Sequence, residues 1–202
     1  MEDFNVFEMM LFTLWIYLPG FLVNTFAMMW GKWLPKTGYG PWPIDGGRMH
    51  KDGNRLLGDG KTWNGLIGGS LTSGLLCYLM TMVPENWVFI SPTEAATGWA
   101  ASAFVLGTFL GFTSLVGDST GSYFKRRKGM KREGDVSSKA PLLDTLPFAI
   151  SVFVFGQLFL TGSNHGDRDL IVPMLLLVVI TPILHRSFNL IGYKIGWKDV
   201  PY

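Results

Sequence analysis

The feature that most limits how this chain can fold is the alternation of long apolar runs with short, charge-dense stretches. Almost no charged side chain interrupts the runs, which cover roughly residues 6–30, 64–83, 98–116, 146–162 and 170–191. A helix needs about 20 apolar residues to cross the hydrocarbon core of a bilayer. A soluble helix would instead confine its apolar residues to one stripe. The pattern predicts an all-α integral membrane protein with about five transmembrane helices.

The length of 202 residues predicts a single membrane domain, 1–202, with two large polar loops at about 31–63 and 117–145. The first residues are acidic and lack the basic segment of a cleavable signal peptide, so we expect the first apolar run to be retained as an anchor. The single cysteine, Cys77, lies within an apolar run. A disulfide framework and a cysteine-based metal site are therefore excluded.

The distribution of lysine and arginine predicts the orientation. Sixteen of the seventeen basic residues fall in the two polar loops or near the C-terminus, and only Arg168 lies on the other side. Because basic residues are retained on the cytoplasmic side of a membrane, we expect both loops and the C-terminus to be cytoplasmic and the N-terminus to lie outside. We then expect the chemistry on the cytoplasmic face. The expected partner is the lipid bilayer, and no binding of nucleic acid is expected.

The first polar loop ends in a glycine-rich segment, Gly-Asp-Gly-Lys-Thr at 58–62. It is not a Walker A loop, because Arg55 occupies the position of an essential glycine and no strand is expected before it. Exposed backbone N–H groups that lead into a helix N-terminus still form an anion site, and Lys61 adds a positive charge. The alternative is a solvated cytoplasmic loop in which Thr62 caps the following helix.

The second polar stretch places Asp118, Ser122 and Lys125 at intervals of four and three residues. If the third helix continues through them, they share one face. A carboxylate beside a hydroxyl and a lysine, followed by Arg126 and Arg127, suits a triphosphate bound with Mg²⁺. The alternative is a basic cluster that binds anionic lipid head groups, which leaves Asp118 unexplained.

Three polar residues near the apolar runs leave alternatives open. Asp144 either caps the fourth helix or joins Asp118 as a metal ligand, since the two residues bracket one loop. Asn24 is expected to form a hydrogen bond between helices. Arg186 either extends toward the interface as an isolated snorkelling side chain or binds a lipid phosphate.

Segments from end to end of the chain resemble one family, the archaeal CDP-archaeol synthases, which are integral membrane cytidylyltransferases related to the CDP-diacylglycerol synthases. The two most specific are Gly-Asp-Gly-Lys-Thr-Trp-Asn-Gly at 58–65 and Gly-Asp-Ser-Thr-Gly-Ser-Tyr-Phe-Lys-Arg-Arg at 117–127. The resemblance extends to Pro19 and Asn24, and to segments 43–45, 141–144 and 185–202. The chain departs from the family pattern at Ala27, where a proline is expected, and at Thr145, where a glutamine often stands.

The resemblance implies the reaction: CTP and 2,3-bis-O-geranylgeranylglycerol 1-phosphate give the unsaturated CDP-archaeol and pyrophosphate, with Mg²⁺ as cofactor. It implies catalytic roles for Asp118, Lys125 and Lys61 and metal binding by Asp118 and Asp144. The lipid phosphate is expected on Arg127, Arg186 and Asn24. The residues expected to bind CTP are Gly58, Asp59, Gly60, Lys61, Thr62, Asn64, Ser122, Lys125 and Arg126.

Two other functions stay open at this point. A related cytidylyltransferase that acts on diacylglycerol phosphate or another lipid phosphate would need the same polar face and a similar apolar groove. A small membrane transporter would need ionisable residues at mid-bilayer depth, and the apolar runs contain almost none.

Overall fold

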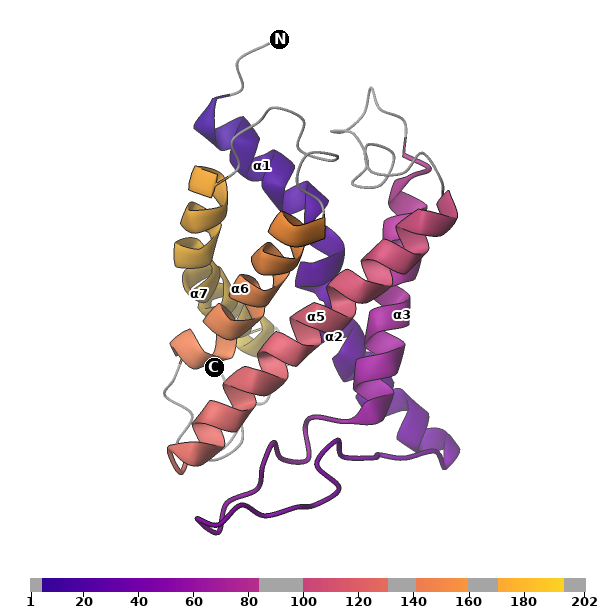
Figure 1. Ribbon diagram of the computed structural model, residues 1–202, viewed down its shortest axis with the longest axis vertical. Helices are drawn as coiled ribbons and strands as arrows, with labels where there is room; N and C mark the ends of the chain where they lie inside the picture. Colours follow the sequence, from indigo (N-terminus) through magenta and orange to yellow (C-terminus); the bar gives the residue numbers. More distant parts are fainter. Residues whose placement is uncertain (1–4, 84–99, 131–140, 160–170, 195–202) are drawn as a thin grey trace.

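The computed structural model describes residues 5–83, 100–130, 141–159 and 171–194, and within these ranges it is helical without strands. Two isolated bridges, Pro43 with Thr62 and Met49 with Arg55, are the extended pairings there. Figure 1 shows the helices, which are α1 Val6–Ile16, α2 Leu18–Trp33, α3 Trp63–Met80, α5 Ala100–Arg127, α6 Pro141–Phe159 and α7 Ile171–Lys194; a short 3₁₀ helix, η1 Leu34–Thr37, follows α2.

The first apolar run forms two helices, α1 and α2, that meet at Tyr17 with a bend of 45°. Asn5 starts α1 with a capping box, in which its side chain accepts from the Glu8 amide at 3.0 Å and the Glu8 carboxylate accepts from the Asn5 amide at 2.9 Å. Pro19 lies in the first turn of α2, where its missing N–H costs least. The ring of Pro19 therefore explains why the run is not one continuous helix.

Two described helices are long and apolar enough to cross a membrane, Ala103–Arg127 and Leu142–Phe159, and the bent pair of α1 and α2 would make a third span. α7 contributes a shorter apolar segment, Ile171–Ile183. α3 has 18 residues, but its buried positions include glycine and serine, which lower its hydropathy. The expected total of about five spans stays a prediction.

Large apolar side chains face outward and small ones face the neighbouring helices. On α3 and α5 the exposed positions recur at intervals of three or four residues: Ile67, Leu71, Leu75 and Leu79, then Val105, Phe109, Phe112 and Val116. Between the two helices a β-carbon added to Gly111 would lie 2.7 Å from the β-carbon of Ser73, and one added to Gly74 would lie 2.5 Å from the carbonyl oxygen of Phe104. Small residues at helix contacts with apolar residues outside are the arrangement of helices packed in lipid.

α5 packs closely against α6 as well as α3. A β-carbon at Gly117 would lie 2.5 Å from the carbonyl oxygen of Pro147, and Gly121 lies against the carbonyl oxygen of Leu143. These glycines bring the second polar stretch into the helix bundle, because only a residue without a side chain permits backbones to approach so closely.

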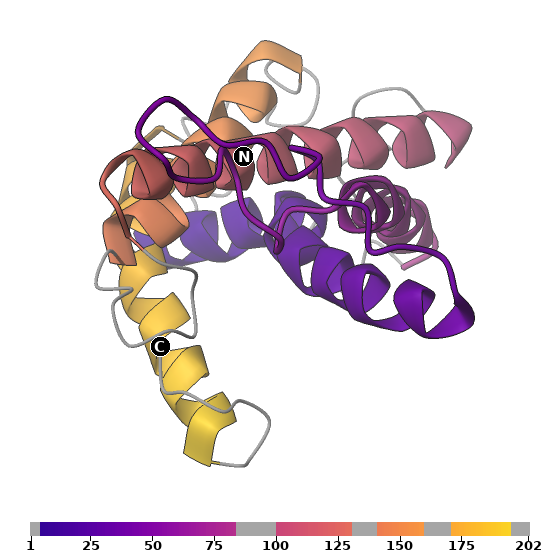
Figure 2. The same ribbon diagram turned by 90° about the horizontal axis from the view of Figure 1, so that it is seen from below.

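The polar stretches meet at one end of the bundle. In Figure 1 the last turns of α2 and α5 and the first turns of α3 and α6 lie at the lower end, and Figure 2 shows the segment 38–62 crossing that end. An ion pair of 2.7 Å between Arg127 and Asp52 fixes the segment to α5. The prediction that both polar stretches share one face is confirmed.

Helical structure extends into both ends of the segment 117–145 that is expected as the second polar loop. Residues 117–127 form the last turns of α5, and α6 begins at Pro141, so that Asp144 lies in its first turn. The helix continues because Gly117 and Gly121 pack on α6, and because three basic residues in its last turn interact favourably with the helix dipole. Helical turns likewise extend into the start of the expected first loop, because α2 continues to Trp33 and η1 to Thr37.

Candidate active site

An ion pair joins the two polar stretches. Lys61, at the end of the first, donates from Nζ to the carboxylate of Asp118 on α5, 57 positions away in the sequence. The hydrogen bond lies at the polar end of the bundle, and the two side chains are 22% and 18% exposed. The pair therefore remains accessible to a ligand that approaches from that end.

A second ion pair joins α5 to α6. Lys125 of α5 donates from Nζ to the carboxylate of Asp144 in the first turn of α6, and both side chains are largely buried. Ser122 is buried one turn before Lys125. Because α5 is continuous, Asp118, Ser122 and Lys125 lie along one face of the helix, as their spacing predicts.

The two carboxylates are suited to a divalent cation. Among the described residues each has one ammonium partner and keeps further lone pairs for other ligands. The residues described here contain no group of three or more acidic, histidine or cysteine side chains that would enclose a metal. Mg²⁺ is commonly bound by one or two carboxylates together with substrate phosphates and water, so Asp118 and Asp144 fit such an ion only with a substrate present.

A third carboxylate, Asp45, organises the first polar segment. It accepts from Arg55 at 2.6 and 3.2 Å and from the backbone amides of Leu57, Gly58 and Gly47 at 3.0, 3.0 and 3.1 Å. Burial by itself raises the pKa of Asp45, but the guanidinium and the three amides outweigh it and hold that pKa well below its usual range. Asp45 therefore acts as an ionised internal anchor for the segment.

Arg127 fixes this segment to α5. Its guanidinium donates to Asp52 at 2.7 Å, to the carbonyl oxygen of Arg55 at 2.7 Å and to that of Asn54 at 3.5 Å. It also lies over the ring of Tyr123, 5.2 Å from the ring centre. The structure thus gives Arg127 a loop-holding role, and its predicted contact with a lipid phosphate stays a prediction.

The glycine-rich turn is already occupied by contacts within the chain. The amide of Gly58, which has a φ of 94°, donates to Asp45, and a β-carbon there would lie 3.3 Å from Nε of Arg126. Asp59 accepts from Arg55 at 2.7 Å, and Gly60 lies exposed at the tip of the turn. Thr62 caps α3 by accepting from the amide of Gly65 at 3.1 Å. The capping alternative for Thr62 is therefore confirmed, and Lys61 is the group of this turn that faces Asp118.

Asn64 is placed as a structural residue. It is buried, and its amide group donates to the carbonyl oxygen of Tyr39 at 3.1 Å. A β-carbon at Gly40, where φ is 89°, would come within 3.0 Å of the Asn64 carbonyl oxygen. The Asn64 carbonyl oxygen is buried without a partner among the described residues. Its predicted contact with CTP would need this turn to open.

The remaining predicted residues, Asn24 and Arg186, belong to helices that contribute no residue to these ion pairs. Asn24 is half-buried in α2, and its side chain makes no hydrogen bond within the part of the chain that the structure describes. Arg186 is exposed on α7, a helix that packs against α6 and α1. Neither contact with a lipid phosphate is tested by these positions.

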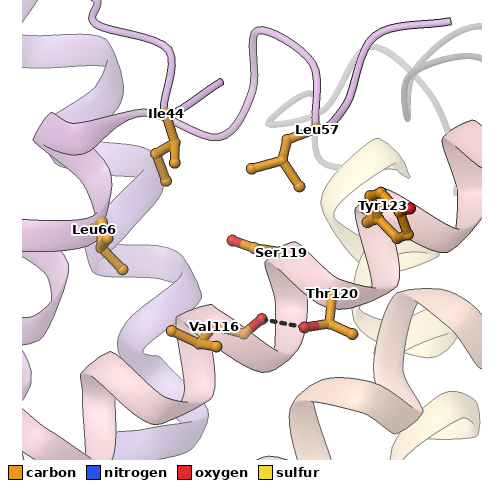
Figure 3. A pocket seen from close by; sticks show the side chains of 7 residues that line it. All are labelled: Ile44, Leu57, Leu66, Val116, Ser119, Thr120 and Tyr123. Atoms are coloured by element: carbon orange, nitrogen blue, oxygen red, sulfur yellow. Dashed lines mark hydrogen bonds between the residues drawn. The ribbon is translucent and has the colours of Figure 1, made fainter. Parts of the chain in front are cut away.

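An open pocket of about 270 Å³ lies between the first polar segment, α3 and the face of α5 that carries Val116, Thr120 and Tyr123. Figure 3 shows the seven side chains around it, Ile44, Leu57, Leu66, Val116, Ser119, Thr120 and Tyr123. Ser119 and Thr120 both bond back to their own helix, at 2.8 Å to the Leu115 carbonyl and 2.9 Å to the Val116 carbonyl. Hydrocarbon therefore forms most of the pocket wall.

Sequence reasoning missed the roles of Asp45, Asp52 and the pocket. In the sequence Asp45 stands out only as part of the segment 43–45. Its spacing of ten residues from Arg55 gives no local signal that the two side chains form a pair. The pocket combines residues from three elements, and no pattern in one segment indicates it.

Comparison with known proteins gives a consistent result. A family model described as CarS-like, CDP-archaeol synthase, matches residues 6–202. The CDP-archaeol synthase of Thermococcus gammatolerans is 36% identical over 193 residues, which are 96% of this chain and 96% of that protein. The CDP-archaeol synthase of Methanosphaerula palustris is 37% identical over 187 residues, covering 92% of this chain and 99% of that protein.

A solved structure has a similar fold. It belongs to work on an intramembrane enzyme for archaeal membrane lipids biosynthesis, and it is 25% identical to this chain with a TM-score of 0.62. The superposition covers 88% of this chain and 92% of that one. The likeness therefore extends over nearly the whole of both chains.

Proposed function

Because the chain belongs to the CDP-archaeol synthase family, we propose that it transfers CMP from CTP to 2,3-bis-O-geranylgeranylglycerol 1-phosphate. The products are the unsaturated CDP-archaeol and pyrophosphate. As a family member it is a membrane cytidylyltransferase of archaeal lipid synthesis. The observation that carries the detailed proposal is the pair of lysine–carboxylate contacts at the polar end of α5.

The reaction needs no nucleophile from the protein. A phosphate oxygen of the lipid attacks the α-phosphorus of CTP, one P–O bond forms, and the bond from the α-phosphorus to the bridging oxygen of pyrophosphate breaks. Since no proton must be moved in this step, the protein contributes positioning and charge stabilisation.

Lys61 and Lys125 are the groups placed to balance charge. In the free protein each ammonium neutralises one carboxylate. We propose that both turn to the triphosphate when the nucleotide binds, so that Asp118 and Asp144 become free to hold a divalent cation. Arg126, which lies against the glycine-rich turn at Gly58, would add a third positive charge for the phosphates.

The proposed cofactor is Mg²⁺, which Asp118 and Asp144 would hold. When bound, such an ion neutralises charge on the triphosphate and on the departing pyrophosphate. The support from this chain is the donor set, two carboxylates on adjacent helices that are mostly screened from water and keep lone pairs unused by the described residues.

The function is tested with purified protein in detergent, CTP and the isoprenoid lipid phosphate, by measuring pyrophosphate and the CDP-lipid together. We expect both products in equal amounts, and their loss when a chelator removes divalent cations. Diacylglycerol phosphate supplied in parallel examines the related activity. A faster reaction with the diacyl substrate would contradict the proposed lipid, and no CDP-lipid from either substrate would contradict the reaction.

We also propose that the polar end of the bundle faces the cytoplasm and the N-terminus lies outside. The positive charge of the two polar stretches supports this orientation. Single cysteines near positions 40 and 130 are expected to react only with reagents admitted to the cytoplasmic side, and one near 165, outside the described residues, from the other side. Native Cys77 is buried, so it adds little background. Labelling near 130 from outside would overturn the orientation.

A further inference from the structure

The segment 38–62 contacts two opposite faces of α5 (Figure 2). At the inner contact, Lys61 donates to Asp118, and at the outer contact, Asp52 accepts from Arg127 at 2.7 Å. Asp118 and Arg127 are nine positions apart on one continuous helix, which makes about two and a half turns at 3.6 residues per turn. Their side chains therefore leave the helix in opposite directions, and the segment passes around α5 from one face to the other.

The outer contact is made by polar groups and not by apolar packing. Besides Asp52, Arg127 donates to the carbonyl oxygens of Arg55 at 2.7 Å and Asn54 at 3.5 Å. Next to these bonds, the open pocket of about 270 Å³ lies between Leu57 of the segment and the outer face of α5 (Figure 3). The apolar side chains that line the pocket do not close on each other, so the hydrogen bonds of Arg127 hold the segment on this face.

Hydrogen bonds within the segment join the outer contact to the inner one. Arg55, whose carbonyl oxygen Arg127 binds, donates from its side chain to Asp45 at 2.6 and 3.2 Å. Asp45 also accepts from the amide of Gly58 at 3.0 Å. The amide of Ile44 donates to the carbonyl oxygen of Lys61 at 2.8 Å. A displacement of the segment at the outer contact is therefore transmitted to the backbone of Lys61.

We propose that the outer contact positions Lys61 for the nucleotide, so that Asp52 and Arg127 are positioning residues of the transfer reaction. This inference rests on the proposed function, which assigns Lys61 to the triphosphate. When the outer contact is broken, the end of the segment that carries Lys61 is less constrained, and its ammonium spends less time beside Asp118. Arg127 then acts through the segment, and not through the lipid phosphate that the family resemblance assigns to it.

Equilibrium binding of CTP to Asp52→Asn, Arg127→Gln and the double variant tests the outer contact. Each single variant is expected to bind CTP about fivefold more weakly, and the double variant no more weakly than either, since both changes remove one shared interaction. In a Lys61→Ala background, Arg127→Gln is expected to change nothing further, because the outer contact acts through Lys61. The control is Lys128→Gln, at an exposed neighbour without an ion pair among the described residues, which should bind CTP like the wild type.

The other outcomes overturn the inference. Additive losses in the double variant, or weakened binding in Arg127→Gln beside a silent Asp52→Asn, would mean that Arg127 contacts a substrate itself. A KM for the lipid phosphate that rises only in Arg127→Gln leads to the same conclusion. Should Arg127→Gln fail to fold, as judged by its melting curve, Arg127→Lys decides instead, because its ammonium keeps the charge and loses the planar fork. Adding Asp52→Asn to Arg127→Lys is then expected to weaken CTP binding further, and no change would contradict the contact.

Lysine labelling without nucleotide separates this inference from the proposed reaction. The protein in detergent is treated with an amine-reactive reagent, and the modification rate of Lys61 is followed by peptide mass spectrometry, with the exposed Lys36 of η1 as internal standard. Asp52→Asn and Arg127→Gln are expected to speed the modification of Lys61 about fivefold. Faster labelling supports the positioning role even if the wild type binds no CTP. Unchanged labelling in both variants, with normal CTP binding by the wild type, refutes the role and leaves the reaction standing.

Discussion

Asp45 and Asp118 lie at the same polar end of the molecule but differ in how many hydrogen bonds their carboxylates already accept. Asp45 has its side chain 1% exposed and accepts from one guanidinium and three backbone amides. Asp118 has one lysine partner and is 18% exposed. The first carboxylate is used up by the fold, whereas the second keeps lone pairs that a ligand can reach. The number of open acceptor sites therefore separates a structural carboxylate from one available for chemistry.

The same comparison separates the two arginines that follow Lys125. Arg127 donates to three oxygens of the first polar segment and holds it on α5. Arg126 donates to the carbonyl oxygen of Met130 and lies against Gly58 beside the proposed phosphate site. Neighbouring residues of one type thus divide between scaffold and site according to the face of α5 that they occupy.

The largest effect is expected from Asp118→Asn. This variant keeps the size of the side chain but loses its charge, so we expect activity to fall by roughly 10²–10³, the scale for removing one charge-stabilising group from an active site. Thermal unfolding should change little, because the side chain is accessible and has one partner. Initial rates at saturating Mg²⁺, with a melting curve on the same preparation, test this. Half of the wild-type activity would remove Asp118 from the site.

Asp45→Asn is expected to do the reverse and destabilise the fold. The asparagine amide would face the donors of Arg55 and of the backbone, so at least one hydrogen bond to a charged group is lost, a cost of about 1.5–3 kcal/mol. Thermal unfolding in detergent should shift downward, while the activity per folded molecule is retained at low temperature. A variant as stable as the wild type would contradict the anchoring role of Asp45.

Lys61→Ala is expected to weaken CTP binding about tenfold, or about 1.4 kcal/mol, and to leave the lipid phosphate nearly unaffected. Lys61→Arg should restore little, because a planar guanidinium does not fill the place of a compact ammonium beside Asp118. Equilibrium binding of CTP to both variants measures this. If Lys61 only sets the orientation in the membrane, Lys61→Arg will be silent and CTP affinity will not change in Lys61→Ala.

The smallest effect concerns acid stability. The folded-state pKa of Asp45 lies well below its unfolded value of about 3.9, so its contribution is present above that value and is lost as the pH falls below it. At pH 3.5 the wild type should have lost about 0.7 kcal/mol of this contribution, and the Asp45→Asn variant none. The gap between their melting temperatures should therefore narrow from pH 6 to pH 3.5. A difference in melting temperature that widens at low pH would mean that folding does not lower the pKa of Asp45.

Much of the arrangement follows from the sequence, because hydropathy and helical spacing are local signals. They predict the helical class, the shared polar face and the common face of Asp118, Ser122 and Lys125 on α5. They leave open whether the helix continues past Gly117, since this glycine and the charges that follow it are also typical of a loop. Only the close packing of α6 on that glycine makes the continuation favourable.

The pairing of charges could not be predicted in the same way. Five described carboxylates and several basic residues share the polar end. Composition cannot assign Lys61 to Asp118 or Arg127 to Asp52, 75 positions apart. These pairs depend on how the segment 38–62 turns back over α5, which is set by the internal hydrogen bonds of Asp45. Long-range geometry decides them, and a single sequence contains no direct record of it.

The glycine contact between α3 and α5 has a mechanical consequence. At Gly74, Gly107 and Gly111 the helices touch with almost no side chain between them, so this crossing resists sliding and acts as a fulcrum. Leu66 lies eight residues from Gly74, a lever arm of about 12 Å at 1.5 Å per residue. A rotation of about 5° at the crossing would therefore displace Leu66 by about 1 Å, so that a small tilt of the two helices would change the width of the pocket that Leu66 lines.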